Sequence, residues 1–155
     1  MKALSLIQPW ATLVAIGVKR VETRTWATPY RGPLAIHASK WRDVDGHAVR
    51  ADVVEYLELS LEEPFATALT RAGIERIGDL PSGAVVATAR LVEVSSTYEA
   101  LRLDRVDAYE REFGNYRPGR YAWFFADVRP LAHPLPYRGQ PGLWDLPDAA
   151  LEVRA

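Results

Sequence analysis

Short apolar runs, each closed by turn-forming residues, constrain the fold of this chain more than any other feature of its sequence. We predict strands at 3–6, 21–26, 34–39, 84–94 and 121–131. The run at 34–39 alternates apolar side chains on one face with small and polar side chains on the other, as a half-buried strand does. Short strands separated by turns, with helices packed outside them, predict an α+β fold built on a small β-barrel.

Helical patterns fill the gaps between these runs. Pro9 suits the first turn of a helix, where its missing N–H costs nothing, and Gly17 suits the C-terminal cap of the same helix. Residues 45–73 carry apolar side chains at helical spacing with acidic side chains opposite, and Pro64 is predicted to begin a second helix there. Two further helices are expected at 104–113 and from Pro147.

The segment 17–24 (GVKRVETR) carries the most informative chemistry of the chain. If a strand follows the turn that holds Lys19, alternation places Glu22, Arg24 and Trp26 on one face. Two cations around a carboxylate, beside an indole ring, are typical of a pocket that reads a polar, planar ligand. The alternative is a solvated cluster of surface ion pairs, which contributes little to stability.

This segment resembles the hallmark of the ASCH (activating signal cointegrator homology) domain, G-x-K-x-x-E-x-R, at every fixed position. The flanking sequences at 8–10 (QPW) and 30–32 (YRG), and the closing sequence 137–146 (YRGQPGLWDL), are similar to the ASCH domain of the nuclear-receptor coactivator for which the family is named. Residues 41–82 match poorly. The resemblance implies a PUA-like small mixed β-barrel with helices packed around it.

The resemblance also implies that the motif lines a cleft between the first helix and the barrel. Lys19 would then meet a phosphate or a ligand carbonyl, and Arg24 would bind a phosphate or a base edge through two donors. Glu22 would accept a hydrogen bond from an exocyclic amine or orient Lys19. These roles are expectations that come from the family.

Residues outside the motif are further candidates for the same cleft. Unsatisfied N–H groups at the helix start near Gln8 make an anion site, and Trp10 is either a ligand contact or part of the core. Basic–aromatic pairs recur in loops, a combination that surfaces for single-stranded nucleic acid use for stacking and backbone contacts. The candidate contacts to ligand or nucleic acid are Gln8, Trp10, Lys19, Glu22, Arg24, Trp26, Tyr30, Arg31, His37, Ser39, Arg117 and Arg120.

Composition excludes several other classes of protein. The 155 residues, 48% of them hydrophobic, suit one domain with a buried core, and the helical stretch around 43–78 is then an insertion in it. The chain has no cysteine, and its three histidines lack ligand spacing, so we predict no metal site and no cofactor. No segment is long enough to span a membrane, and a cytoplasmic location is expected.

Charge is distributed unevenly along the chain. The net charge is −1, yet the segment 43–63 holds seven acidic residues and one basic residue, which leaves an excess of five positive charges elsewhere. An anionic partner would therefore meet the part of the molecule outside this acidic segment.

Two functions of different classes fit these features. The first is a stand-alone ASCH domain that binds RNA or a modified nucleoside, with DNA or an unknown protein as further partners. The second is a small hydrolase of the ASCH type, an N4-acetylcytidine-like amidohydrolase or a ribonuclease, with Lys19 and Glu22 as catalytic residues. Glu22 stands where the amidohydrolase pattern has threonine, and strand alternation would point the adjacent Thr23 to the opposite face. We therefore favour binding.

Overall fold

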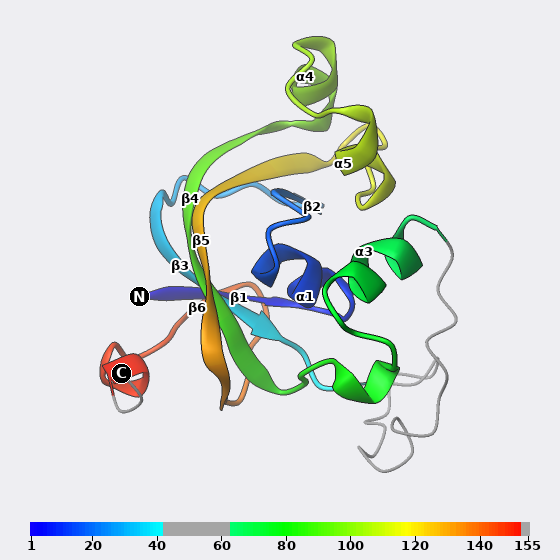
Figure 1. Cartoon of the computed structure of the whole chain (residues 1–155). Helices are drawn as coiled ribbons and strands as arrows, with labels where there is room; N and C mark the ends of the chain where they lie inside the picture. Colours follow the sequence, from blue (N-terminus) through cyan, green and yellow to red (C-terminus); the bar gives the residue numbers. More distant parts are fainter. Residues whose placement is uncertain (42–62, 153–155) are drawn as a thin grey trace.

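The computed structural model of the protein describes residues 1–41 and 63–152 (Figure 1). Six strands form one mixed sheet in the order β2-β5-β4-β3-β1-β6, in which β1 and β3 are parallel and all other neighbours antiparallel. The strands are β1 (Lys2–Leu6), β2 (Val21–Arg24), β3 (Gly32–Ala38), β4 (Ala84–Ser96), β5 (Tyr121–Pro136) and β6 (Leu143–Asp145).

The sheet curls into a half-barrel, as Figure 1 shows most clearly for the long strands β4 and β5. The register between these two strands shifts at three places, and such bulges bend a pair of strands and increase its twist. Asp127 in β5 has a left-handed backbone, with φ at 51°, beside this irregular pairing. The predicted α+β small barrel is confirmed.

The helices are α1 (Trp10–Ala15), α3 (Phe65–Arg71), α4 (Thr97–Arg102), α5 (Ala108–Glu112) and α6 (Ala149–Glu152), with a 3₁₀ turn at Ile77–Asp79. The first predicted helix is confirmed, and Gly17 takes a φ of +78° just after it. The helix after Pro64 is also confirmed as α3. The rest of the predicted helical stretch, 45–62, lies outside the described residues.

One predicted helix starts later than expected and one helix was not predicted, each because of a local N-terminal cap. The helix expected at 104–113 starts only at Ala108, because the Asp107 carboxylate accepts the backbone N–H of Glu110 and caps it there. An additional helix, α4, follows Ser96, whose hydroxyl oxygen accepts the N–H of Glu99 in the same way. In the tail, β6 pairs with β1, and this short strand is absent from the strands predicted above.

Helix α1 lies in the hollow of the curled sheet (Figure 1) and is buried over most of its length. Its residues Ala11 and Val14 share the main core with Leu6 from β1, Ile36 from β3 and Trp123 from β5. This packing fixes the start of α1 close to the end of β1. Within the described ranges 1–41 and 63–152, no helix is long and apolar enough to cross a membrane.

Candidate functional site

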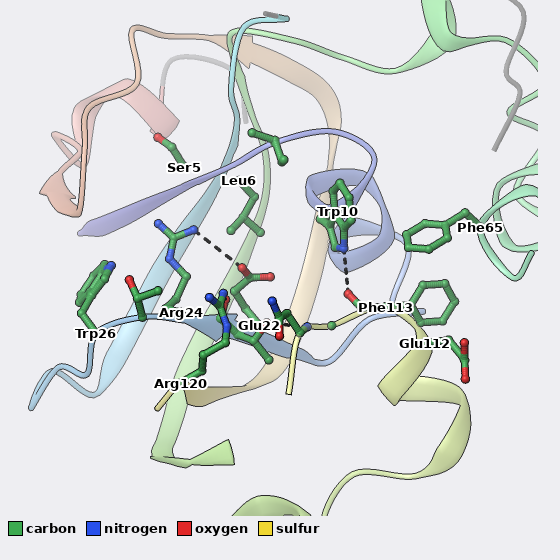
Figure 2. Close-up of a pocket in the computed structure, with 15 residues that line it drawn as sticks. Ser5, Leu6, Trp10, Glu22, Arg24, Trp26, Phe65, Glu112, Phe113 and Arg120 are labelled. Carbon is green, nitrogen blue, oxygen red and sulfur yellow. Dashed lines mark hydrogen bonds and ion pairs between the residues drawn. The ribbon is translucent and has the colours of Figure 1, made fainter. Parts of the chain in front are cut away.

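A cavity of about 630 Å³ opens between the end of β1, the start of α1, β2, α3 and the turn after α5 (Figure 2). Its volume lies within the range of ligand sites in proteins. Its wall consists of Ser5, Leu6, Ile7, Trp10, Glu22, Thr23, Arg24, Thr25, Trp26, Phe65, Glu112, Phe113, Gly114, Asn115 and Arg120. Five of the sequence candidates therefore meet in one cavity, namely Trp10, Glu22, Arg24, Trp26 and Arg120.

Glu22 is the buried acid of this wall, with 11% of its side chain exposed. One carboxylate oxygen lies 3.7 Å from Lys19 Nζ and the other lies 3.8 Å from Arg24 Nη1. Both are ion-pair distances that are too long for hydrogen bonds. Burial raises the pKa of Glu22, and the neighbouring cations of Lys19, Arg24 and Arg120 oppose that shift.

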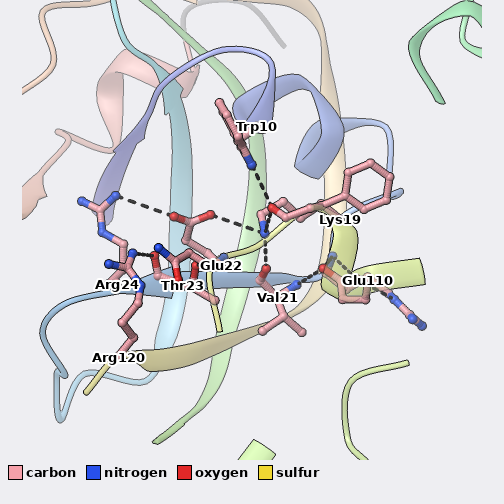
Figure 3. A network of polar contacts seen from close by, with 11 residues as sticks. Trp10, Lys19, Val21, Glu22, Thr23, Arg24, Glu110 and Arg120 are labelled. Atoms are coloured by element: carbon pink, nitrogen blue, oxygen red, sulfur yellow. Dashed lines mark hydrogen bonds and ion pairs between the residues drawn. The ribbon is translucent and has the colours of Figure 1, made fainter. Parts of the chain in front are cut away.

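Lys19 lies behind Glu22 and does not belong to the cavity wall (Figure 3). Its side chain is 0% exposed, and its ammonium donates to the carbonyl oxygens of Val21 and, at 3.0 Å, Phe113. Burial lowers the pKa of Lys19, against the attraction of Glu22 and Glu110. A direct contact between Lys19 and a ligand, as the resemblance implies, would require Lys19 to give up these hydrogen bonds to the two carbonyl oxygens.

The carbonyl of Phe113 joins the motif to the turn after α5. Trp10 Nε1 donates to it at 2.8 Å and Lys19 Nζ at 3.0 Å, as Figure 3 shows. The buried carboxylate of Glu110 accepts the backbone N–H of Val21 at 3.1 Å and that of Arg20 at 2.9 Å. These bonds hold α5 and the turn that follows it against β2, and so fix one wall of the cavity.

Two arginines face the cavity from different segments. Arg24, at the end of β2, lies over the ring of Trp26 with its guanidinium carbon 5.8 Å from the ring centre. Arg120 donates from Nη2 to the carbonyl of Thr23 at 2.9 Å, whereas its buried Nε has no partner among the described residues. Both guanidinium groups lie on the Glu22 side of the cavity in Figure 2.

Thr23 also contributes to the wall, although strand alternation predicted that it faces away from Glu22. Its hydroxyl oxygen accepts the backbone N–H of Asn115 at 3.0 Å. The hydroxyl therefore anchors the turn 113–115, which is a structural use of the side chain. Trp26 lies beyond the end of β2, in contact with Trp123 at 4.6 Å between ring centres.

Three sequence candidates near the ends of β1 and β3 lie outside the cavity wall. Gln8 is buried and bridges the carbonyl of Pro81 and the backbone N–H of Thr12, at 2.6 and 3.1 Å. It therefore serves the helix start itself. His37 bonds to Ser5 and to the carbonyl of Tyr137, and the Ser39 backbone N–H donates to Leu6.

The remaining three candidates, Tyr30, Arg31 and Arg117, lie in loops outside the wall. The Tyr30 hydroxyl donates to the carbonyl of Pro33, and the Arg31 guanidinium donates to the carbonyl of Thr28 at 2.9 Å. Arg117 is exposed, and its backbone N–H donates to Asn115. Tyr30 and Arg31 thus order their own turn.

Several wall residues escaped the sequence reasoning, chiefly Ile7, Phe65 and the turn 113–115. Ile7 is 64% exposed at the lip, beside a Trp10 ring that meets Phe65 edge to face at 5.5 Å. The sequence alone does not show that Ile7, which precedes Gln-Pro-Trp, is exposed. Among residues 1–41 and 63–152, no cluster of three acidic or histidine side chains could hold a metal ion.

Comparison with known proteins places these features in context. The sequence model of the ASCH domain matches residues 4–134. Activating signal cointegrator 1 from Mus musculus and from Homo sapiens is 25% and 27% identical over 146 residues, which cover 92% of this chain and 22% of each relative. The chain thus spans about a fifth of the length of these relatives.

Solved structures show the same architecture. The crystal structure of ASCH from Zymomonas mobilis superposes with a TM-score of 0.50 at 14% identity, over 97% of this chain and 90% of that one. A mutant form of the same protein gives a TM-score of 0.52 over 98% and 94%. At this identity the likeness shows the fold alone.

Proposed function

The chain belongs to the ASCH domain family, and we propose that it binds RNA, or a modified nucleoside, in the cavity beside Glu22. The observation that carries this proposal is a buried carboxylate that faces the cavity without a hydrogen bond from any described residue. Such a group gains an interaction when a ligand brings an N–H donor, and the exocyclic amines of nucleobases are donors of this kind.

The rest of the wall supplies what a nucleotide requires besides its base edge. Arg24 and Arg120 offer donors for a phosphate or a carbonyl, and guanidinium groups bind both. Trp10, Trp26 and Phe65 offer aromatic surface on which a base can stack. The excess of positive charge outside the segment 43–63 would attract the phosphate backbone of a longer strand.

The test is fluorescence anisotropy of a labelled short single-stranded RNA across a salt series. We expect the dissociation constant to rise with salt, and to rise roughly tenfold in Arg24→Ala, because a charge-assisted contact is lost. The matched control is Arg129→Ala, an exposed arginine outside the cavity, which should bind like the native protein. A competing single-stranded DNA of the same sequence tells RNA from DNA. Unchanged affinity in Arg24→Ala would contradict the assignment of the cavity.

A hydrolase remains the alternative because a buried lysine and glutamate whose pKa values shift in opposite directions are typical of catalytic sites. In this case Glu22, the member of the pair that lines the cavity, would act as the general base. Chromatography of N4-acetylcytidine, and of an RNA after incubation with the protein, tests both chemistries. Turnover that disappears in Glu22→Gln would assign the chain to the hydrolases, whereas binding without turnover supports the binding module.

A further inference from the structure

We propose that the cavity selects a base edge with two adjacent N–H donors, as guanine presents with its ring N1–H and its exocyclic amine. This inference rests on the proposed function and deepens it by naming the ligand edge that Glu22 would read. It follows from the number, position and environment of the free polar groups in the wall.

The two Glu22 oxygens determine which ligand group can bind beside them. Each has a cation as its nearest charged neighbour, at 3.7 Å for Lys19 and 3.8 Å for Arg24, and neither accepts a hydrogen bond from the described part of the chain. A carboxylate whose oxygens are ion-paired but accept no hydrogen bond still offers two parallel acceptors, spaced like two neighbouring donors on a base edge. The complementary ligand group carries two parallel donors.

Arg24 and Arg120 line the same cavity as Glu22. Guanine has a carbonyl oxygen, O6, directly beside its N1–H, so a site that reads this edge also needs a donor next to the carboxylate. Arg24 is in ion-pair contact with Glu22, and the nearby Arg120 cation opposes the rise in the pKa of Glu22 that burial causes. The guanidinium groups of both arginines can donate to a ligand carbonyl in this cavity.

The other bases do not match the donors and acceptors of the same wall. Cytosine and adenine place an amine beside a ring nitrogen that accepts, so one carboxylate oxygen would face another acceptor. Uracil flanks its single N–H with two carbonyls. In each case a buried acceptor stays unsatisfied or is repelled, and this costs binding energy that guanine retains.

Isothermal titration calorimetry with mononucleotides tests this inference on the native protein. The decisive pair is guanosine monophosphate and inosine monophosphate, which differ only by the exocyclic amine. We expect the guanine nucleotide to bind roughly tenfold or more tightly than the inosine nucleotide, and also more tightly than the cytosine, adenine and uracil nucleotides.

Variants sharpen the same experiment. Glu22→Gln replaces one acceptor oxygen with an amide donor and should abolish the difference between the guanine and inosine nucleotides. Glu75→Gln makes the same chemical change at an exposed glutamate outside the cavity and should preserve that difference. Circular dichroism and thermal unfolding establish that each variant is folded.

The outcomes separate the two proposals. Equal binding of all five nucleotides, or a guanine preference that survives Glu22→Gln, would overturn the inference and leave nucleic-acid binding in place. No binding of any nucleotide or RNA would overturn both. An arginine-containing peptide also offers two parallel donors, and tighter binding of that peptide than of the guanine nucleotide would overturn the inference in favour of a protein ligand.

Discussion

The molecule contains two buried polar clusters on opposite sides of β1, and they differ in how completely their atoms are bonded. The closed cluster consists of Ser5, His37, Tyr137, Gly139 and Trp144. Trp144 Nε1 donates to Ser5 Oγ at 3.2 Å, Ser5 Oγ lies 3.2 Å from His37 Nδ1, and His37 Nε2 lies 3.0 Å from the Tyr137 carbonyl. Because a carbonyl only accepts, Nε2 carries the proton, and the Ser5 hydroxyl has two acceptors within reach, His37 Nδ1 and, at 3.3 Å, the Gln140 carbonyl.

The open cluster consists of Lys19, Glu22, Arg24 and Arg120. Lys19 is as fully bonded as the closed cluster, but the Glu22 oxygens and Arg120 Nε have no hydrogen-bond partner among the described residues. Ser5 of the closed cluster also lines the cavity, but in Figure 2 its hydroxyl points away from Glu22. A satisfied cluster holds the fold together, whereas a buried cluster with free acceptors and donors has the capacity to bind a ligand.

The largest effect should come from Lys19→Met. This change leaves Glu22 without its nearest buried cation and the carbonyl of Phe113 without one donor, so we expect a loss of roughly 3–5 kcal/mol in the free energy of unfolding. Urea unfolding measures this loss, and Lys40→Met, at an exposed lysine, is the control. A loss no larger than that of the control would mean that Lys19 does not fasten the wall of the open cluster.

Gly139→Ala should break the closed cluster alone. An added Cβ would lie 2.4 Å from His37 Cε1 and 2.8 Å from Ser5 Oγ, with little room for the buried ring to move. We expect a loss of about 1–3 kcal/mol in unfolding free energy, as for other overpacked sites. RNA affinity measured on the folded variant should equal that of the native protein. A weaker affinity would show that the two clusters are coupled.

The smallest effect is a pH dependence of stability that originates in His37. Burial lowers the pKa of His37 from its ordinary 6.5, so the unfolded chain takes up this proton before the folded protein does. Stability should therefore fall as the pH drops below about 6.5, by at most about 1.4 kcal/mol for each unit of pKa shift.

The check is the unfolding free energy of the native protein minus that of His37→Gln, followed from pH 8 to pH 5. We expect this difference to shrink as the solution becomes more acidic. A difference that does not vary with pH would contradict a neutral His37 in the closed cluster.

The sequence predicted the features that depend on a pattern within one segment of the chain. The Gly17 cap and the strand alternation of Glu22 and Arg24 follow from spacing along a single segment, whereas the small barrel was predicted from several strands and from the family resemblance. Lys19 precedes β2, and its full burial was not foreseen because it depends on contact with Phe113, which is distant in the sequence.

Residues brought to the cavity by tertiary packing left no local signal. Phe65 and Asn115 line the same cavity as Glu22 from segments tens of residues away. Tyr30 and Arg31, which were predicted as contacts to ligand or nucleic acid, lie outside the cavity wall, where they order their own turn. The Ser96-x-x-Glu99 spacing was the one available signal for α4, since it is a capping pattern.

The most direct test of the difference between the clusters is the set of tryptophan indole N–H signals in a ¹H–¹⁵N spectrum during titration with a short guanine-containing single-stranded RNA. Trp10 and Trp26 line the cavity of the open cluster, whereas Trp144 donates within the closed one. We predict that the Trp10 and Trp26 signals shift with RNA and that the Trp144 signal stays in place. A shift of Trp144 with Trp10 and Trp26 unmoved would contradict the assignment of binding to the open cluster.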